Sequence, residues 1–295
     1  MTRQSDDTHG LEERPMQSNN PVFRRSEEFT TAGGQPHYGS TGYTDPATWS
    51  TGNPGQPGQP SAPVATGGPM TIDSVVQKTA LSLAVVMVTA AATWILSPDV
   101  DQNTDPSAIS GLIAAATIGS LLAFVLSMVN SFKRVISPAL VILFCAAEGV
   151  ALGAISKVFD MAYPGVVMSA VIGTFGAFAG TLAVYKFFNI KVTDKFRRMV
   201  VAAMLGVVAI SLIEVVLSLF GAQIGFFEDG SLGLIFAVVG LALGVFMLVL
   251  DFDFVEQGVR NGIPDREGWR AAFAMTVSLV WIYTNLLRIL AIMRD

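Results

Sequence analysis

Cysteine and histidine are nearly absent from this chain. It has one cysteine, Cys145, and two histidines, His9 and His37, both near the N-terminus. A single cysteine can form neither an internal disulfide nor a cysteine metal cluster. With no histidine after residue 37, the rest of the chain cannot hold an HExxH zinc site or a Ser-His-Asp triad. We therefore expect a protein that is not an enzyme and has no cofactor.

Charge is also scarce. Charged residues make up 14% of the chain and hydrophobic residues 52%, with a mean hydropathy of +0.54. Soluble domains carry about 25% charged residues. The composition therefore predicts an integral membrane protein whose main partner is the lipid bilayer. The net charge of -5 gives no reason to expect a nucleic-acid partner.

Residues 1–70 lack any apolar run. They are rich in Gly, Pro, Ser, Thr, Asn and Gln, and include GNPGQPGQP at 52–60. Such a segment cannot bury enough apolar surface to offset chain ordering, which predicts a disordered arm. The arm has no apolar h-region, so it is not a signal peptide. Residues 71–295 form the second expected region, a membrane domain.

Seven long apolar runs fill this second region. About 20 helical residues cross a hydrocarbon core of about 30 Å. The runs must be helical, because lipid offers no partner to an unpaired backbone group. The sequence thus predicts an all-α, polytopic seven-helix bundle. The predicted spans are 75–97, 107–130, 138–158, 165–187, 199–222, 231–252 and 269–292.

Basic residues between the runs gather on one side, which predicts the orientation. That side holds Lys78, Lys133, Arg134, Lys186, Lys191, Lys195, Arg197, Arg198, Arg260, Arg266 and Arg270. The other side holds Lys157 and Arg294. We expect a cytoplasmic arm and an external C-terminus. If the last run were re-entrant, the C-terminus would instead be cytoplasmic.

Three spans carry glycines four residues apart, which allow helix backbones to approach closely. The pairs are Gly149 with Gly153, Gly176 with Gly180, and Gly240 with Gly244. We interpret them as packing contacts between helices.

Three of the ionisable residues inside predicted spans are of particular interest, because burial there is costly and often marks a pathway. Glu148 and Glu214 are each either a protonated carboxyl bonded to a neighbouring helix or part of a cation or proton relay. Arg288 can extend its side chain outward or pair with one of these glutamates, and we prefer pairing.

The last span is the most polar. Ser278, Asn285 and Arg288 recur at i, i+7 and i+10 and share one face with Trp281. A helix this polar should avoid lipid, so we expect it at the centre of the bundle.

Three carboxylates, Asp251, Asp253 and Glu256, follow the sixth run. They form either an ordinary solvated helix end or a mouth that binds a hard cation such as Ca²⁺ or senses pH. Asp253 and Glu256 can share a helix face, whereas Asp251 and Asp253 cannot.

Several segments together resemble the Bax inhibitor-1/YccA-like family, also called the transmembrane Bax inhibitor motif family, in its bacterial members. The segments are NPVF at 20–23, MTIDSVV at 70–76, AEG at 147–149 through Gly153, YK at 185–186, VTDKF at 192–196, RMV at 198–200, LDFD at 250–253 and NLLR at 285–288.

This resemblance implies a pH-sensitive calcium leak through a seven-helix fold in the bacterial plasma membrane. It also implies a cytoplasmic latch of two aspartates. The first matches Asp251, but the second falls at Ser278, so this chain departs from the pattern. A serine cannot share a proton with Asp251 as an aspartate does, and Asp253 or Glu256 is a candidate to compensate. Other relatives inhibit membrane proteases, which implies an interaction role.

Two functional hypotheses follow. The first is a Ca²⁺ or H⁺ leak in which Asp251 gates, Glu148 and Glu214 line the pathway and Arg288 balances charge. The second is a membrane regulator that binds a membrane protease or a stress-response partner, with the long arm as the motivation. An intramembrane hydrolase is disfavoured, since no GxGD-type aspartate lies inside a span.

Overall fold

A computed structural model describes residues 68–99, 106–188, 190–222, 224–226 and 230–294. The chain divides into two units, residues 1–62 and 63–295, and the description below concerns the second. The expected disordered arm lies outside the described residues, apart from its last three positions.

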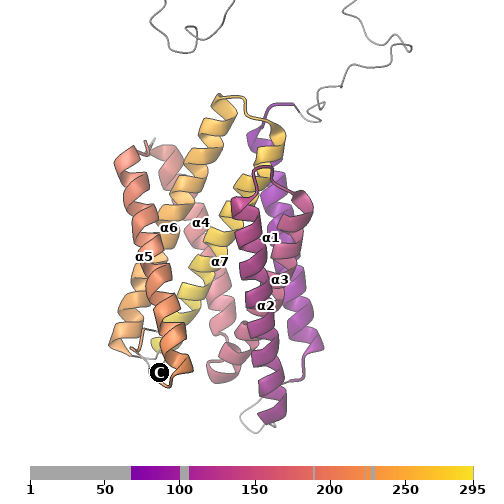
Figure 1. Ribbon diagram of the computed structural model, residues 1–295, viewed down its shortest axis with the longest axis vertical. Coiled ribbons are helices and arrows are strands. Elements are labelled where there is room, and N and C mark those ends of the chain that lie inside the picture. Colours follow the sequence, from indigo (N-terminus) through magenta and orange to yellow (C-terminus); the bar gives the residue numbers. More distant parts are fainter. Residues whose placement is uncertain (1–67, 100–105, 189, 223, 227–229, 295) are drawn as a thin grey trace, which may run out of the picture. The chain divides into compact units, whose positions relative to one another are not determined.

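The described residues form seven long helices and one short 3₁₀ helix (Figure 1). All seven are long and apolar enough to cross a membrane, which confirms the predicted all-α polytopic fold. They are α1 (Ile72–Leu96), α2 (Pro106–Phe132), α3 (Pro138–Ala162), α4 (Val166–Phe187), α5 (Asp194–Leu219), α6 (Ser231–Arg260), η4 (Asp265–Glu267) and α7 (Gly268–Ile292).

Two helices extend five or more residues beyond their predicted spans. α5 begins five residues before the predicted start at 199, because Thr193 caps it by accepting a hydrogen bond from the Phe196 N–H. α6 continues past 252 to Arg260 and ends before Gly262, whose φ of 61° suits a glycine. Both ends carry charged residues, so hydropathy alone placed the boundaries too far inside.

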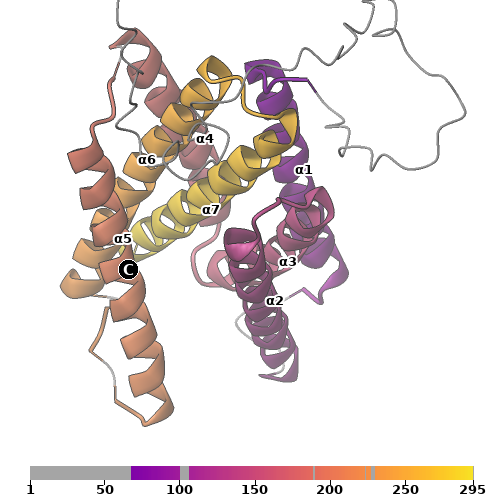
Figure 2. The same ribbon diagram turned by 45° about the horizontal axis from the view of Figure 1, so that its top comes forward.

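The last helix is central, as predicted. α7 packs against α1, α3, α4 and α6, and it runs between the flanking helices in both ribbon views (Figures 1 and 2). The sequence did not indicate that α3 is covered to a similar extent. In the most apolar 18-residue stretch of each helix, 56% of the residues of α3 and 50% of those of α7 are buried. The bundle therefore has two inner helices.

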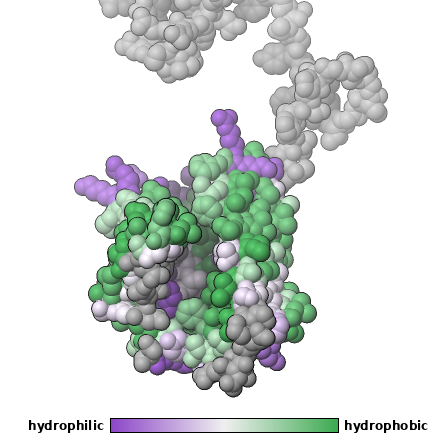
Figure 3. Space-filling view, turned by 60° about the horizontal axis from the view of Figure 1, so that its bottom comes forward, coloured by the Kyte–Doolittle hydropathy of each residue, from purple (hydrophilic) through white to green (hydrophobic). Residues whose placement is uncertain are grey.

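Lipid-facing surfaces cover the rest of the bundle. Large apolar side chains are exposed along α1, α2, α4 and α5. Figure 3 shows apolar side chains dominating one such face, around a hollow in the surface. This surface suits a hydrocarbon solvent.

Two of the three glycine pairs pack helices together. A Cβ at Gly149 or Gly153 would collide with α1, and one at Gly240 or Gly244 would collide with α7. The prediction is wrong for the third pair, on α4. A Cβ at Gly176 or Gly180 would meet no described atom within 4 Å.

Candidate functional site

The centre of the α6–α7 contact holds a buried carboxyl. Asp251 of α6 is 8% exposed, and Ser278 of α7 is 2% exposed. The Ser278 hydroxyl donates a hydrogen bond to Asp251 Oδ2 at 2.6 Å. Ser278 thus occupies the position that the resemblance implied for the second latch residue, but it supplies a hydroxyl where a second carboxyl was expected.

The remainder of the polar face of α7 also turns toward α6 and the connection before it. Trp281 Nε1 donates to the Gly240 carbonyl at 2.8 Å, and Asn285 Nδ2 donates to the Trp281 carbonyl at 2.8 Å. One turn further on, Arg288 Nη2 donates to the Phe226 carbonyl at 2.7 Å. The predicted polar stripe therefore forms a helix–helix contact in which these donors have acceptors, as a low-dielectric setting requires.

Asp253 lies nearer the end of α6 and has a basic partner. Its carboxylate is 7% exposed and accepts from Arg197 Nη2 of α5 at 2.9 Å and from Gln257 Nε2 at 2.6 Å. This contact joins α5 to α6 by a charge-assisted hydrogen bond.

Glu256 is more exposed and has different neighbours. It accepts a 2.7 Å hydrogen bond from the Tyr185 hydroxyl of α4 and lies 3.6 Å from Arg260 Nη1. The three acidic side chains of α6 thus do not converge on one point. Among the described residues, no group of three or more His, Cys, Asp or Glu side chains is placed to hold a metal ion.

Glu148 of α3 faces a separate cavity of about 280 Å³, formed with α2 and α7. Ser120, Ser127 and Thr284 bring hydroxyl groups to its lining, and Trp281 forms part of the wall. Trp281 contributes to both regions, because it lines this cavity and also donates to the Gly240 carbonyl of α6. α7 therefore lies between two acids, the buried Asp251 of α6 and the partly exposed Glu148 of α3.

Glu214 and Arg288 hold the connection between α5 and α6. Glu214 Oε1 accepts from the Gly225 N–H at 2.9 Å, and its buried Oε2 has no hydrogen-bond partner among the described residues. Arg288 bonds to the adjacent Phe226. Both Glu214 and Arg288 thus bond to backbone groups of the 224–226 segment. Pairing of Arg288 with a glutamate stays a prediction.

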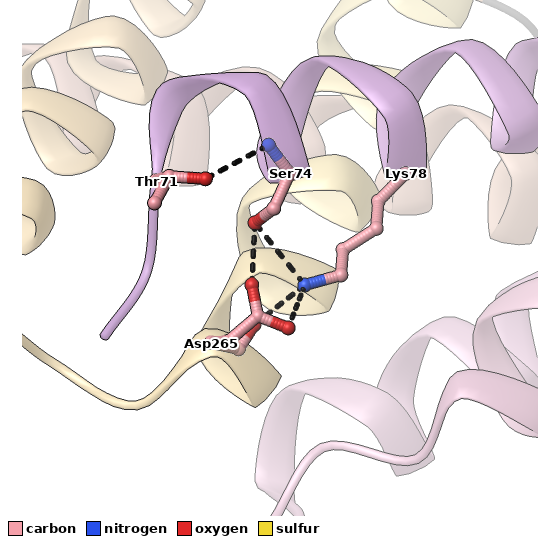
Figure 4. Close-up of polar contacts among 4 residues, drawn as sticks. All are labelled: Thr71, Ser74, Lys78 and Asp265. Carbon is pink, nitrogen blue, oxygen red and sulfur yellow. Dashed lines mark hydrogen bonds and ion pairs between the residues drawn. The ribbon is translucent and has the colours of Figure 1, made fainter. Parts of the chain in front are cut away.

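Sequence reasoning missed a polar cluster where α1 begins (Figure 4). Lys78 Nζ donates to Asp265 Oδ2 at 2.8 Å and to its backbone carbonyl at 2.7 Å. Ser74 Oγ donates to Asp265 Oδ1, and Thr71 caps the helix through the Ser74 N–H. The spacing of Ser74 and Lys78 on one helix face is visible in the sequence, but their partner lies 187 or more residues away.

Backbone hydrogen bonds reinforce the same junction. The Met70 N–H donates to the Ile263 carbonyl at 2.8 Å, and the Asp265 N–H donates to the Gly68 carbonyl at 3.0 Å. The segment just before α1 is thus attached to the connection between α6 and α7.

Lys157 is buried despite its charge. It lies near the end of α3 and is 5% exposed. Its Nζ donates to the carbonyls of Trp94 and Ser97 at 2.9 Å each and lies 3.5 Å from Asp99 Oδ1. It satisfies carbonyls at the C-terminus of α1, where a cation is favourable.

Comparison with known families identifies the family of the chain. The family model described as Bax inhibitor 1 like matches residues 20–295. The chain belongs to this family. A search of curated proteins finds no match. In this Bax inhibitor 1-like protein, the buried α6–α7 contact pairs Asp251 with the hydroxyl of Ser278.

Proposed function

We propose that this protein is a membrane cation leak, for Ca²⁺ or H⁺, that acts without catalysis or a cofactor. The observation that carries the proposal is Asp251, a carboxyl buried between the two long helices α6 and α7 and held by Ser278. An acid inside a membrane bundle is costly and commonly serves an ion or proton path.

Glu148 is the second intramembrane acid of this proposal. Measured along the helix axis, Asp251 lies about 14 Å before the end of α6, and Glu148 lies about 15 Å after the start of α3. These helix ends belong to the side that is rich in Lys and Arg, so the two acids have similar depth. In this proposal Asp251 is the gate, Glu148 lines the pathway, and Glu214 and Arg288 flank its other end.

The orientation belongs to the same proposal. Because Lys and Arg concentrate on the side of the α1 start, we place that side and the arm in the cytoplasm and the C-terminus outside. The membrane proposed is the bacterial plasma membrane.

The test is Ca²⁺ and H⁺ flux into liposomes that contain the purified full-length chain. The double variant Asp251→Asn, Glu148→Gln replaces both ionisable carboxyls with amides of nearly the same shape, and we expect flux to fall about tenfold or more. The matched control is Glu256→Gln, at an exposed carboxylate of α6, which should leave flux within about twofold of wild type. Wild-type flux in the double variant would reject the assignment.

A second candidate function is regulation of a membrane protease or a stress-response partner through the arm. The supporting observation is the pair of backbone hydrogen bonds that attach residues 68 and 70 to the α6–α7 connection. A partner that binds the arm would then act on the helices that carry Asp251 and Ser278. Deleting residues 1–65 should abolish co-purification of the partner and spare flux. Loss of flux with retained partner binding would contradict this role for the arm.

A further inference from the structure

A second, larger cavity lies outside the acidic sites, among α1, α3, α4 and α7. Its volume is about 620 Å³, within the range of about 300–1,000 Å³ usual for small-molecule sites. It opens toward the lipid-facing surface, because Met87 of α1 and Met168 of α4, both in its lining, are 53% and 64% exposed.

The length of this cavity matches one leaflet of the membrane. Along α1 its lining runs from Leu83 to Ile95, about 18 Å of helix, and along α4 from Gly165 to Phe175, about 15 Å. Half of a hydrocarbon core is about 15 Å. The cavity therefore reaches from the end of the bundle where α1 ends to about the middle of the membrane.

The inner wall has no polar group that calls for a polar ligand. Ser156 and Tyr283 bond to each other through their hydroxyls at 2.6 Å, and Thr174 donates to the Ala170 carbonyl at 2.8 Å. The remaining lining in this part is apolar. A hydrocarbon chain fits such a wall, since it needs no hydrogen bonds.

Charge appears at the outer end of the cavity alone. Asp160 lies there, and its Oδ1 accepts from the Gly165 N–H at 2.8 Å, while its other oxygen accepts from no described residue. Two cations lie nearby, but Lys157 is committed to carbonyls of α1 and to Asp99, and Arg294 donates to the Pro164 carbonyl at 2.7 Å. Asp160 therefore makes the mouth complementary to a positively charged headgroup.

We propose that this cavity binds one acyl chain of a phospholipid whose headgroup carries an amine, such as phosphatidylethanolamine, with the amine beside Asp160. The site is distinct from the acidic sites and does not depend on the proposed ion leak.

Two adjacent alanines of α1 supply a matched pair of variants. Ala91 lines the cavity and Ala92 does not, although both are exposed. In native mass spectrometry of the full-length chain extracted from membranes, wild type and Ala92→Phe should retain phosphatidylethanolamine. Ala91→Phe, which fills the cavity, should retain about tenfold less. Equal retention by the two variants, or a second copy of the chain in place of lipid, overturns the proposal.

The headgroup is tested with Asp160→Asn, which keeps an acceptor oxygen for Gly165 but removes the charge. Wild type should prefer phosphatidylethanolamine to anionic phosphatidylglycerol, and the variant should lose this preference. An unchanged preference contradicts the place given to the amine.

A measurement on the unaltered cavity guards against misfolding of Ala91→Phe. Trp94 lines the cavity. Its fluorescence is obtained by subtracting the emission of the Trp94→Phe variant from that of wild type. In nanodiscs, phosphatidylethanolamine with brominated chains should quench Trp94 more than in proportion to its share of the lipid, and more than brominated phosphatidylglycerol. Proportional quenching that is equal for the two lipids overturns the proposal.

Discussion

The two sides of α7 are built differently. On one side, α3 meets α1 through Gly149 and Gly153, and it meets α2 where Gly119 approaches Ala151. These backbones touch closely, so dispersion forces act along much of the helix length. On the other side, α5 packs against α6 and buries few residues, namely Val200, Val207 and Glu214.

Polar contacts take a larger part in holding α5. They are the Arg197–Asp253 ion pair near its start and the Glu214 contact with Gly225 near its end. A ring contact between Phe196 and Phe246, with centroids 5.6 Å apart, adds to them. The α1–α3 side is therefore held by close backbone packing, whereas the α5–α6 side is held by a few specific contacts, of which the Arg197–Asp253 pair is the one near Asp251.

The largest expected effect comes from disturbing the tight side. Gly149→Val places a side chain against Thr89 and the Val86 carbonyl, and we expect a loss of about 3 kcal/mol in unfolding free energy. Reversible unfolding in mixed micelles measures it. The control is Gly176→Val on α4, which meets open space and should change stability by less than about 0.5 kcal/mol. Similar losses in both would remove the distinction between packed and unpacked glycines.

Ser278→Ala tests the buried acid on the looser side. It deprives Asp251 of its 2.6 Å donor in a buried setting, and we expect a loss of about 1–3 kcal/mol. Ser127→Ala, in the lining of the Glu148 cavity, is the comparison and should cost less than about 0.5 kcal/mol. The same unfolding assay serves for both. Equal costs would mean that the two acids depend alike on neighbouring hydroxyls.

Ser278→Asp sharpens the comparison in a different way. Two carboxyls this close cannot both be ionised and therefore share a proton. We expect flux to depend more steeply on pH in the variant than in wild type, by about tenfold between pH 5 and pH 8. Ser278→Asn is the uncharged control. A pH profile in Ser278→Asp that matches that of wild type would show that position 278 does not control the path.

Arg197→Ala should have a smaller effect, because the Arg197 side chain is 46% exposed. We expect a loss of about 1 kcal/mol, since buried Asp253 retains Gln257 as a donor. Arg198→Ala is the neighbouring control, at a side chain bonded only to a backbone carbonyl of its own helix, and should be near neutral. If opening occurs on this side, Arg197→Ala also speeds the leak, whereas unchanged flux would place the opening elsewhere.

The smallest effect is expected at the junction before α1. Asp265→Asn weakens the contact with Lys78, which is partly exposed, and should cost about 0.5 kcal/mol. Hydrogen exchange at the Met70 amide, which bonds to the Ile263 carbonyl, should become faster. Unchanged exchange would show that the backbone bonds hold this junction without the side chains.

Much of the fold was predictable, because a chain must cross the hydrocarbon core as long apolar helices. Each of these helices appears in the sequence as a separate apolar run. All seven spans were found, and the polar stripe of Ser278, Asn285 and Arg288 correctly indicated a central last helix. The ends of α5 and α6 were misplaced, since helical hydrogen bonding continues where hydropathy falls.

The candidate site was predictable as a set of residues and not as a set of contacts. The sequence singled out Glu148 and Glu214 because a charge in lipid is costly wherever it lies, and Asp251 through the acidic cluster and the family resemblance. It could not show that Glu148 faces its own cavity, or that Glu214 and Arg288 turn to the 224–226 segment. Composition and order along the chain set which segments enter the membrane. The pairing of distant side chains depends on how helices rotate and pack against one another, and only the tertiary structure decided that.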